Sequence, residues 1–138
     1  MKCVFCEIAA GTIPAEIVWR GHGALAFLDH RPLFPGHILL IPDAHYQTLP
    51  DLPPELLTSF FGAVQLLENA VEAAMHSEGS FVAINNRVSQ SVPHLHVHIV
   101  PRSKGDGLKG FFWPRHKYLS EEHFLETAEK IRLKLGHS

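Results

Sequence analysis

Polar and apolar side chains alternate in the stretch His94-Leu95-His96-Val97-His98-Ile99-Val100-Pro101, and the alternation is strict from His94 to Ile99. A period of two is typical of a β-strand with one buried face. We therefore expect the three histidines to share one face of a strand over 94–99, while the residues between them enter a hydrophobic core. The row predicts a functional face at this strand, and the alternative is a plain surface row of histidines.

The spacing of the histidines limits what they can do together. Neighbours on one face of a strand lie about 6.5–7 Å apart at Cα, and the outer pair lies about 13 Å apart. Metal–nitrogen bonds are about 2 Å long, so three histidines on a straight strand cannot easily share one metal ion. The row therefore indicates a division of labour in which at least one imidazole is not a metal ligand.

The composition is that of an ordinary globular protein. The chain has 138 residues, of which 46% are hydrophobic and 19% charged, and its formal net charge is −2. We expect one domain over residues 1–138. The small net charge argues against nucleic-acid binding, and no apolar run is long enough to span a membrane. The lack of a signal peptide and the presence of only two cysteines favour a cytoplasmic protein.

The other periodic segments predict an α+β domain. We expect a short helix at 3–10, further strands at 16–19, 24–29, 37–42 and 81–84, and the histidine strand at 94–99. Short connections between the first three strands favour an antiparallel arrangement. The prediction is a five-stranded antiparallel sheet with two main helices.

Each main helix should bury one apolar stripe. The first should follow Asp51 as its N-cap and end near 77–79, and the second should follow Ser120 as its N-cap. Apolar residues spaced by three and four predict the buried positions. These are Leu57, Phe60, Phe61, Val64, Leu67, Val71 and Met75 in the first helix, and Phe124, Ala128, Ile131 and Leu135 in the second.

The histidine row and the loop before it, residues 90–99, read Gln-Ser-Val-Pro-His-Leu-His-Val-His-Ile. This segment resembles the signature of the histidine triad (HIT) superfamily of nucleotidyl hydrolases and transferases. Residues 25–29, residues 35–42 and His45 fit the same family in order and spacing. The resemblance covers about residues 3–106 and leaves 107–138 as a C-terminal loop and helix. It implies a HIT-like fold and a homodimer, because members of the family usually pair their sheets edge to edge.

One departure from the family lies in the loop at 85–89, which is shorter than in many members. Ser89 stands where many of them carry Gly before the Gln.

The resemblance also implies the chemistry. A neutral imidazole is a good nucleophile near pH 7, because its reference pKa is about 6.5. The middle histidine, His96, is implied to attack the α-phosphorus of a nucleotide and form a nucleotidyl-histidine that water hydrolyses. His98 would donate to a phosphate oxygen. Ser91 and backbone N–H groups of the Gln90–Ser91 turn would meet the phosphate and the leaving group.

The nucleotide needs an apolar slot for a purine base and an acid for the ribose hydroxyls. By resemblance Asp29 accepts from the ribose, and His30 beside it is a further candidate. Either Asn85 or Asn86 would contact ribose or phosphate, and the sequence leaves the choice open. The apolar slot is implied to consist of Phe5, Ile8, Ile13 and Phe27, whose alternative role is plain core.

The pair Cys3-x-x-Cys6 supplies two thiolates of a tetrahedral zinc site and requires two more ligands. A thioredoxin-like motif would need a preceding strand, and only two residues precede Cys3. Resemblance to the zinc-bearing bacterial branch of the family implies that His45 and His94 complete the site. The zinc would be structural, since no coordination position stays open. The alternative is an unligated or oxidised pair of cysteines.

The expected function is hydrolysis of a nucleotide at its α-phosphate. The leaving group would be an amine, as in a phosphoramidate, or a second nucleotide, as in a dinucleoside polyphosphate. Arg102 and Lys104 slightly favour the polyphosphate, because they could hold extra phosphates. The alternatives are a nucleotidyl transferase and a non-catalytic module that binds nucleotide and zinc.

An aromatic cluster, Phe111-Phe112-Trp113-Pro114, lies outside the family pattern. Three consecutive large aromatic side chains are too apolar to stay in water. They either cover their own core or reach across a two-fold interface to line the nucleotide site of a partner subunit.

Overall fold

The computed structural model describes residues 2–108 and 114–136. The chain forms two compact units, Met1–Asp106 and Gly107–Ser138. The first unit ends where the family resemblance in the sequence ends. The aromatic residues Phe111, Phe112 and Trp113 lie outside the described residues, so their expected reach to a partner stays a prediction.

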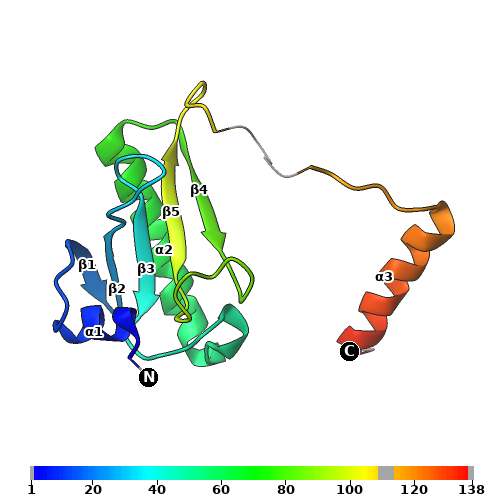
Figure 1. Cartoon of the computed structure of the whole chain (residues 1–138), viewed down its shortest axis with the longest axis horizontal. Coiled ribbons are helices and arrows are strands. Elements are labelled where there is room, and N and C mark those ends of the chain that lie inside the picture. Colours follow the sequence, from blue (N-terminus) through cyan, green and yellow to red (C-terminus); the bar gives the residue numbers. More distant parts are fainter. Residues whose placement is uncertain (1, 109–113, 137–138) are drawn as a thin grey trace. The chain divides into compact units, whose positions relative to one another are not determined.

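The first unit contains an antiparallel sheet of five strands in the order β1-β2-β3-β5-β4 (Figure 1). The strands are β1 (Ile17–Gly21), β2 (Ala24–Leu28), β3 (Ile38–Pro42), β4 (Gly79–Ile84) and β5 (Val97–Arg102). The sheet and the α+β class are those that the sequence predicts.

Two helices cover opposite faces of this sheet: α1 (Val4–Ala10) and the longer α2 (Pro54–Met75). In Figure 1, α1 lies in front of the sheet and α2 behind it. The alternation within β2 assigns its residues to the two faces, since Ala24 and Ala26 share a buried cluster with α2, while Leu25 and Phe27 share one with α1. The sheet thus separates two apolar layers.

The long helix begins later than the sequence predicts. Asp51 belongs to a 3-10 turn (Leu49–Asp51), where its Oδ2 accepts from the N–H of Thr48 at 3.1 Å and from its hydroxyl at 2.8 Å. Pro53, in extended conformation, is the N-cap of α2 instead. Asp51 was expected to be that cap, and the prediction was wrong because its carboxylate is already bound in the preceding turn.

The buried stripe of α2 is also narrower than predicted. Phe60, Val64, Leu67 and Val71 are buried against the sheet. Leu57, Phe61 and Met75 are 38%, 36% and 41% exposed, so their predicted burial was wrong. At 100° per residue these three positions lie to one side of the buried stripe, on the flank of the helix.

Strand β5 begins at Val97, three residues after the predicted start. The N–H of Leu95 donates to the carbonyl of Tyr46 at 2.6 Å, outside the ladder of the sheet. The alternation nevertheless holds, because Leu95, Val97 and Ile99 are fully buried in the cluster with α2.

The second unit contains α3 (Glu121–Leu135). The hydroxyl of Ser120 accepts from the N–H of His123, so the predicted N-cap is confirmed. The predicted burial was wrong, because no residue of α3 is buried; Phe124, Ile131 and Leu135 are 49%, 58% and 73% exposed. A clear apolar spacing shows which face a helix offers, but not that this face is covered. No helix within the described residues is long and apolar enough to cross a membrane.

Candidate functional site

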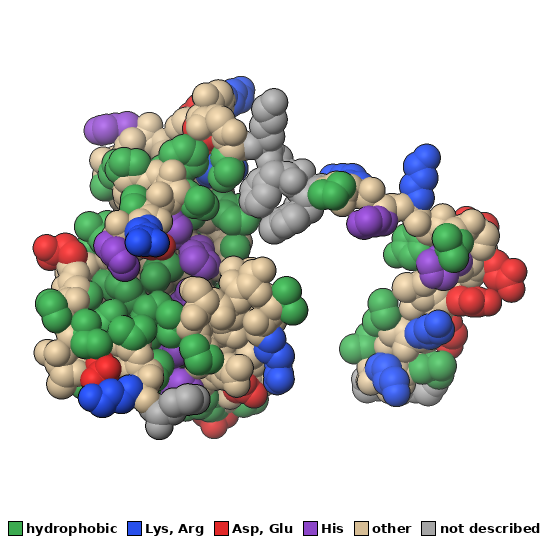
Figure 2. Space-filling model, viewed as in Figure 1, with side chains coloured by type: hydrophobic (Ala, Val, Ile, Leu, Met, Phe, Trp, Pro, Cys, Tyr) green, Lys and Arg blue, Asp and Glu red, His purple; other side chains and the backbone are tan. Residues whose placement is uncertain are grey.

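The face of the sheet that carries α1 also carries the histidine row. His96 and His98 alternate with Leu95, Val97 and Ile99, which face α2, so their rings point to the other side. The His96 and His98 ring centroids are 5.1 Å apart. Figure 2 shows histidine side chains gathered around a patch of hydrophobic side chains on this face.

His96 is held in one tautomer. Its Nδ1–H donates to the carbonyl of His94 at 2.7 Å, which leaves the lone pair of Nε2 free. The ring is 3% exposed and meets the ring of Phe5 edge-on at 5.1 Å between centroids. Burial lowers the pKa of His96, while the bond to His94 and the charge of Asp29 oppose this shift. His96 therefore offers a neutral nucleophilic nitrogen.

His98 carries its proton on the opposite nitrogen. The N–H of Leu33 donates to Nδ1 of His37 at 3.0 Å, so a neutral His37 bears its proton on Nε2. That Nε2–H donates to Nδ1 of His98 at 3.0 Å. Nδ1 of His98 is then an acceptor, and its Nε2 bears the proton. His98 is therefore prepared to donate a hydrogen bond to an anionic oxygen.

The carboxylate of Asp29 lies beside this chain, with Oδ2 at 3.6 Å from Nε2 of His37, which is beyond hydrogen-bond distance. The ligand-type atoms of Asp29, His37 and His98 lie within 4.8 Å of one another, as they would in a metal site. However, the tautomer of His37 leaves no lone pair on Nε2 for a metal. We therefore assign His37 to a hydrogen-bonded chain that orients His98, with the charge of Asp29 beside it.

His37 is the residue of this site that the sequence analysis missed. It lies opposite Asp29 in the hairpin of β2 and β3, where the N–H of Asp29 donates to the His37 carbonyl at 3.0 Å. Pairing the predicted strands 24–29 and 37–42 end to end would have placed the two residues together.

Acid should destabilise the fold through His98. Burial, together with the neighbouring His96 and His37, lowers the pKa of His98 to about 4. Between pH 6.5 and about 4 the unfolded chain binds a proton at this ring that the folded chain does not bind. The free energy of unfolding should therefore fall by up to about 1.4 kcal/mol per pH unit for such a group. Urea unfolding at pH 7.0 and 5.5 measures this, and His98→Gln should lose less stability on acidification; an equal loss would contradict the assignment.

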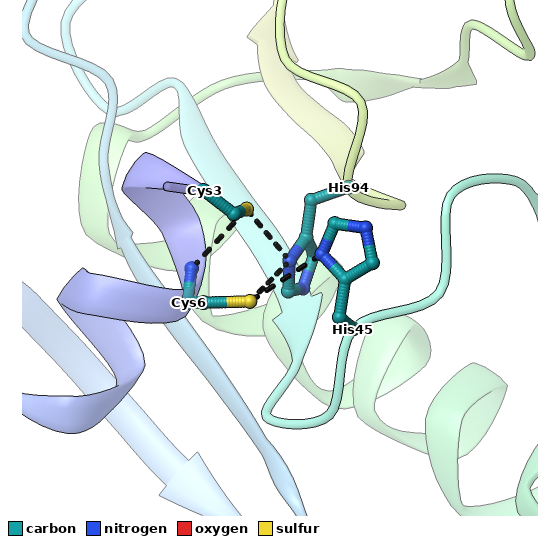
Figure 3. Close-up of side chains that lie close together, drawn as sticks. All are labelled: Cys3, Cys6, His45 and His94. Carbon is teal, nitrogen blue, oxygen red and sulfur yellow. Dashed lines mark hydrogen bonds between the residues drawn. The ribbon is translucent and has the colours of Figure 1, made fainter. Parts of the chain in front are cut away.

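Four further side chains form the second cluster: Cys3, Cys6, His45 and His94, whose ligand atoms all lie within 4.8 Å of one another (Figure 3). Nδ1 of His94 lies 3.4 Å from Sγ of Cys3 and 3.5 Å from Sγ of Cys6. Nδ1 of His45 lies 3.4 Å from Sγ of Cys6. A tetrahedral zinc ion holds sulfur and nitrogen ligands about 3.5 Å apart, so the donor set and its spacing fit zinc.

The protonation states in this cluster suit a cation. Nε2–H of His94 donates to the carbonyl of Pro42 at 2.9 Å, which leaves its Nδ1 lone pair directed at the thiols. Burial and the nearby Cys3 raise the pKa of the Cys6 thiol, which disfavours its thiolate when no cation is near. A metal ion would supply the missing positive charge.

The predicted nucleotide slot forms one apolar cluster beneath α1. Phe5 and Phe27 meet edge-on at 5.4 Å between centroids, with Ile8 buried beside them and Ile13 packed against the cluster. Asp29 is half-buried at the end of this cluster and accepts from the N–H of Arg31 at 2.9 Å. His30 next to it is exposed.

In the loop between β4 and the histidines, two of the predicted site residues, Asn86 and Gln90, form hydrogen bonds that fix the loop itself. Oδ1 of Asn86 accepts from the N–H of Leu49 at 2.8 Å. Gln90 accepts from the N–H of Arg87 at 2.8 Å and donates to the carbonyl of Gln47 at 2.6 Å. The side chains of Asn86 and Gln90 thus anchor the loop.

Two other residues of this loop stand out by their surroundings or backbone. Ser91 is exposed and lines a pocket of about 380 Å³ together with Lys2, His45 and Gln47. Ser89 has φ 61°, the left-handed conformation that explains why glycine is common there in the family.

Comparison with known proteins places these residues in a family context. The family model "HIT domain" matches residues 10–105. An uncharacterized HIT-like protein of Methanocaldococcus jannaschii is 38% identical over 106 residues, which cover 76% of this chain and 82% of that protein. The adenosine 5'-monophosphoramidase hnt1 of Schizosaccharomyces pombe is 30% identical over 136 residues, covering 98% and 99%. An asymmetrical bis(5'-nucleosyl)-tetraphosphatase of the same yeast is 35% identical over 96 residues, covering 68% of this chain and 53% of that protein.

Solved structures of HIT family proteins also superpose on this chain. A HIT family protein from Bacillus subtilis superposes with a TM-score of 0.87 at 33% identity and covers the whole of both chains. A Zn-bound histidine triad family protein from Mycobacterium smegmatis superposes with a TM-score of 0.74 at 34% identity, covering 99% of each chain.

Proposed function

The chain belongs to the HIT domain family, and on that premise we propose that it hydrolyses a purine nucleotide at the α-phosphate through a nucleotidyl-histidine intermediate. The observation that carries this proposal is the pair of opposite tautomers, with a free lone pair on Nε2 of His96 and a proton on Nε2 of His98. One ring is prepared to attack phosphorus and its neighbour to bind the negative charge of the phosphate.

In the first step Nε2 of His96 bonds to the α-phosphorus and the bond from phosphorus to the leaving group breaks. The leaving group departs with a proton from the hydroxyl of Ser91, the donor that the sequence predicts. His98 and the backbone N–H groups of Gln90 and Ser91 hold the phosphate oxygens. In the second step water attacks the same phosphorus and the bond from phosphorus to Nε2 of His96 breaks. The proton that water loses passes to Ser91, so both His96 and Ser91 return to their neutral forms.

The base and ribose would bind beside these histidines. Phe5, Ile8, Ile13 and Phe27 are proposed to enclose the base, with Asp29 and His30 at the ribose. Because the Asn86 side chain is bound to Leu49, we propose Asn85 for the contact to ribose or phosphate.

The leaving group depends on which side chains could bind additional phosphates. The guanidinium of Arg102 donates to Asp106 at 2.6 and 3.1 Å, so this residue would have to leave an ion pair to hold an extra phosphate. The support from Arg102 for a dinucleoside polyphosphate is therefore weaker than the sequence suggests. We therefore propose a phosphoramidate as the better substrate, in line with the monophosphoramidase relative that spans nearly the whole chain.

A turnover screen tests this proposal directly. The zinc-loaded protein would be given adenosine 5'-phosphoramidate and a dinucleoside tetraphosphate, with release of adenosine monophosphate as the readout. We expect turnover of both classes and a higher kcat/KM for the phosphoramidate. No turnover of either, with adenosine monophosphate still bound, would favour the non-catalytic nucleotide-binding alternative; transfer to an added acceptor in place of water would favour the transferase.

Asp29→Asn should weaken nucleotide binding through the ribose. Loss of hydrogen bonds to a charged acceptor costs about 1–3 kcal/mol, or roughly 5- to 150-fold in Kd. Calorimetry with adenosine monophosphate and with its 2',3'-dideoxy form measures the effect. The dideoxy nucleotide is the matched control, since its affinity should hardly change with the substitution. Equal losses for both nucleotides would place Asp29 away from the ribose.

We further propose that the four-ligand cluster of Cys3, Cys6, His45 and His94 holds a structural zinc ion and that the protein is cytoplasmic. The zinc proposal is supported by the spacing of the donors and by the Zn-bound structure of the M. smegmatis relative. Such an ion would tie α1 to the loop after β3 and to the start of the histidine row.

We also propose a homodimer. Strand β4 is an edge of the sheet, and Val82 on this strand is 37% exposed. Leu57 and Phe61 on the flank of α2 are exposed as well. An apolar edge of this kind needs a cover, and a second copy would extend the sheet. Sedimentation equilibrium should give twice the chain mass, and a monomer at micromolar concentration would contradict the proposal.

A further inference from the structure

We infer that the zinc ligands also position the nucleophile His96, so that the metal site supports catalysis as well as stabilising the fold. The inference rests on the proposed function of His96. It comes from three separate contacts, each of which starts at a ligand or at its neighbour in the chain and ends at His96 or at the peptide that orients it.

The first contact runs through His94 itself. Its ring is fixed at Nε2 by the carbonyl of Pro42. At Nδ1 it is held by the thiols of Cys3 and Cys6 (Figure 3). Its backbone carbonyl accepts the Nδ1–H of His96 at 2.7 Å. One residue thus holds the metal with its side chain and the nucleophile with its backbone.

The second contact fixes the same peptide from its other end. The carbonyl of His94 belongs to the peptide unit whose N–H comes from Leu95. This N–H donates to the carbonyl of Tyr46 at 2.6 Å, and Tyr46 directly follows the ligand His45. The plane of that peptide, and with it the direction of the His94 carbonyl, therefore depends on where His45 is held.

The third contact is the ring of Phe5, which lies between Cys3 and Cys6 in the sequence. This ring meets His96 edge-on at 5.1 Å and His94 at 6.0 Å between centroids. Phe5 is 7% exposed and belongs to a short helix whose N-cap is Cys3, with Sγ accepting from the N–H of Cys6. Binding of a metal by Cys3 and Cys6, which flank Phe5 in the sequence, would thus hold the Phe5 ring in contact with His96.

All four ligands therefore act on one imidazole. His94 binds His96 directly through its carbonyl. The other three ligands act as positioning residues through the peptide 94–95 and through Phe5. Loss of the metal should let the His96 ring turn and exchange tautomers, while the base and ribose contacts of the substrate remain.

His45→Ala tests this inference, because His45 is exposed and is proposed to bind the metal, while other residues are proposed to bind the base and the ribose. We expect its kcat to fall about tenfold or more, with a smaller change in KM, since supporting residues of a metal site typically contribute 10–100-fold. Excess zinc should restore part of the loss. The second readout needs no substrate: nitrogen-15 spectra of the imidazoles should show a single tautomer for His96 in the zinc-loaded protein and an exchanging ring in His45→Ala or after chelation of the wild type.

The matched control is Leu67→Ala, or Val71→Ala if its melting temperature is closer to that of His45→Ala. Both residues are buried against the far face of the sheet. They should lower stability without changing kcat per folded molecule or the spectrum of His96. An unchanged His96 spectrum and unchanged kcat after complete metal removal would overturn the inference. Absence of turnover in the zinc-loaded wild type would instead overturn the proposed function, and the spectra would still decide whether the metal orients His96.

Discussion

His96→Asn is expected to lower kcat by about a thousandfold or more while nucleotide affinity stays within a few-fold of wild type. The loss falls on the chemical step, because asparagine cannot form the bond to phosphorus that the free Nε2 of His96 forms. The substitution keeps a polar side chain of smaller size in a site that is nearly closed to solvent. Single-turnover kinetics and equilibrium binding of adenosine monophosphate measure the two effects separately.

The control is His22→Asn, a substitution of the same kind at an exposed turn between β1 and β2. His22 has φ 51°, a conformation that asparagine adopts readily, so the fold should be unaffected. We expect wild-type kcat for this variant. A His96→Asn enzyme that keeps more than about a tenth of the wild-type rate would show that the nucleophile is another group.

Replacing Cys3 and Cys6 with serine is expected to remove the metal and much of the stability. Wild-type protein should carry about one zinc per chain, and the double variant should carry none. A ligand present at 100 to 1,000 times its Kd stabilises a fold by about 3–4 kcal/mol, which corresponds to a melting temperature about 10 °C higher for a chain of this size. Elemental analysis of protein purified without added metal and thermal unfolding measure both effects.

The His22→Asn variant again serves as the comparison, since this histidine lies outside the cluster and should leave the zinc content at one. Equal zinc content in the wild type and in the double cysteine variant would contradict the assignment. A normal melting temperature in a variant that has lost its zinc would mean that the metal does not stabilise the fold.

Much of the fold could be predicted because strict alternation leaves a strand only one arrangement on a half-buried sheet. The row His94 to Ile99 assigned its histidines to one face and Leu95, Val97 and Ile99 to the core, and both assignments hold in the structure. Distance alone predicted only that the three imidazoles divide their roles, and the resemblance to the family assigned His94 to the metal. In the structure Nδ1 of His94 lies near the thiols, while His96 and His98 lie together.

The missing parts depend on contacts that no local pattern contains. His37 joins the site only through cross-strand pairing and through a backbone N–H four residues earlier in the chain. Gln90 and Asn86 have side chains suited to a phosphate or a ribose, yet they hold the loop through Gln47 and Leu49. Hydrogen bonds of this kind depend on the position of a distant backbone, which residue type and spacing do not reveal.

The prediction of which helix residues are buried was wrong for a related reason. The spacing in α2 and α3 shows apolar residues on one side, but the width of the buried stripe depends on what lies opposite. The sheet covers only one side of the predicted α2 stripe, so Leu57 and Met75 on the other side stay exposed. The described residues of its own unit, 107–108 and 114–136, contain no strand that could cover α3, and no residue of this helix is buried.

The most direct test of the nucleotidyl-histidine mechanism is to trap the covalent intermediate on wild-type protein. Protein and adenosine 5'-phosphoramidate would be mixed and quenched within milliseconds in alkaline denaturant, because a neutral imidazole is a poor leaving group and preserves the bond from nitrogen to phosphorus. Peptide mass spectrometry then locates the added nucleotide. We expect one adenylyl group on His96 of the wild type and no adenylyl group on the His96→Asn variant. An adduct on any other residue, or turnover without any covalent adduct, would contradict this mechanism.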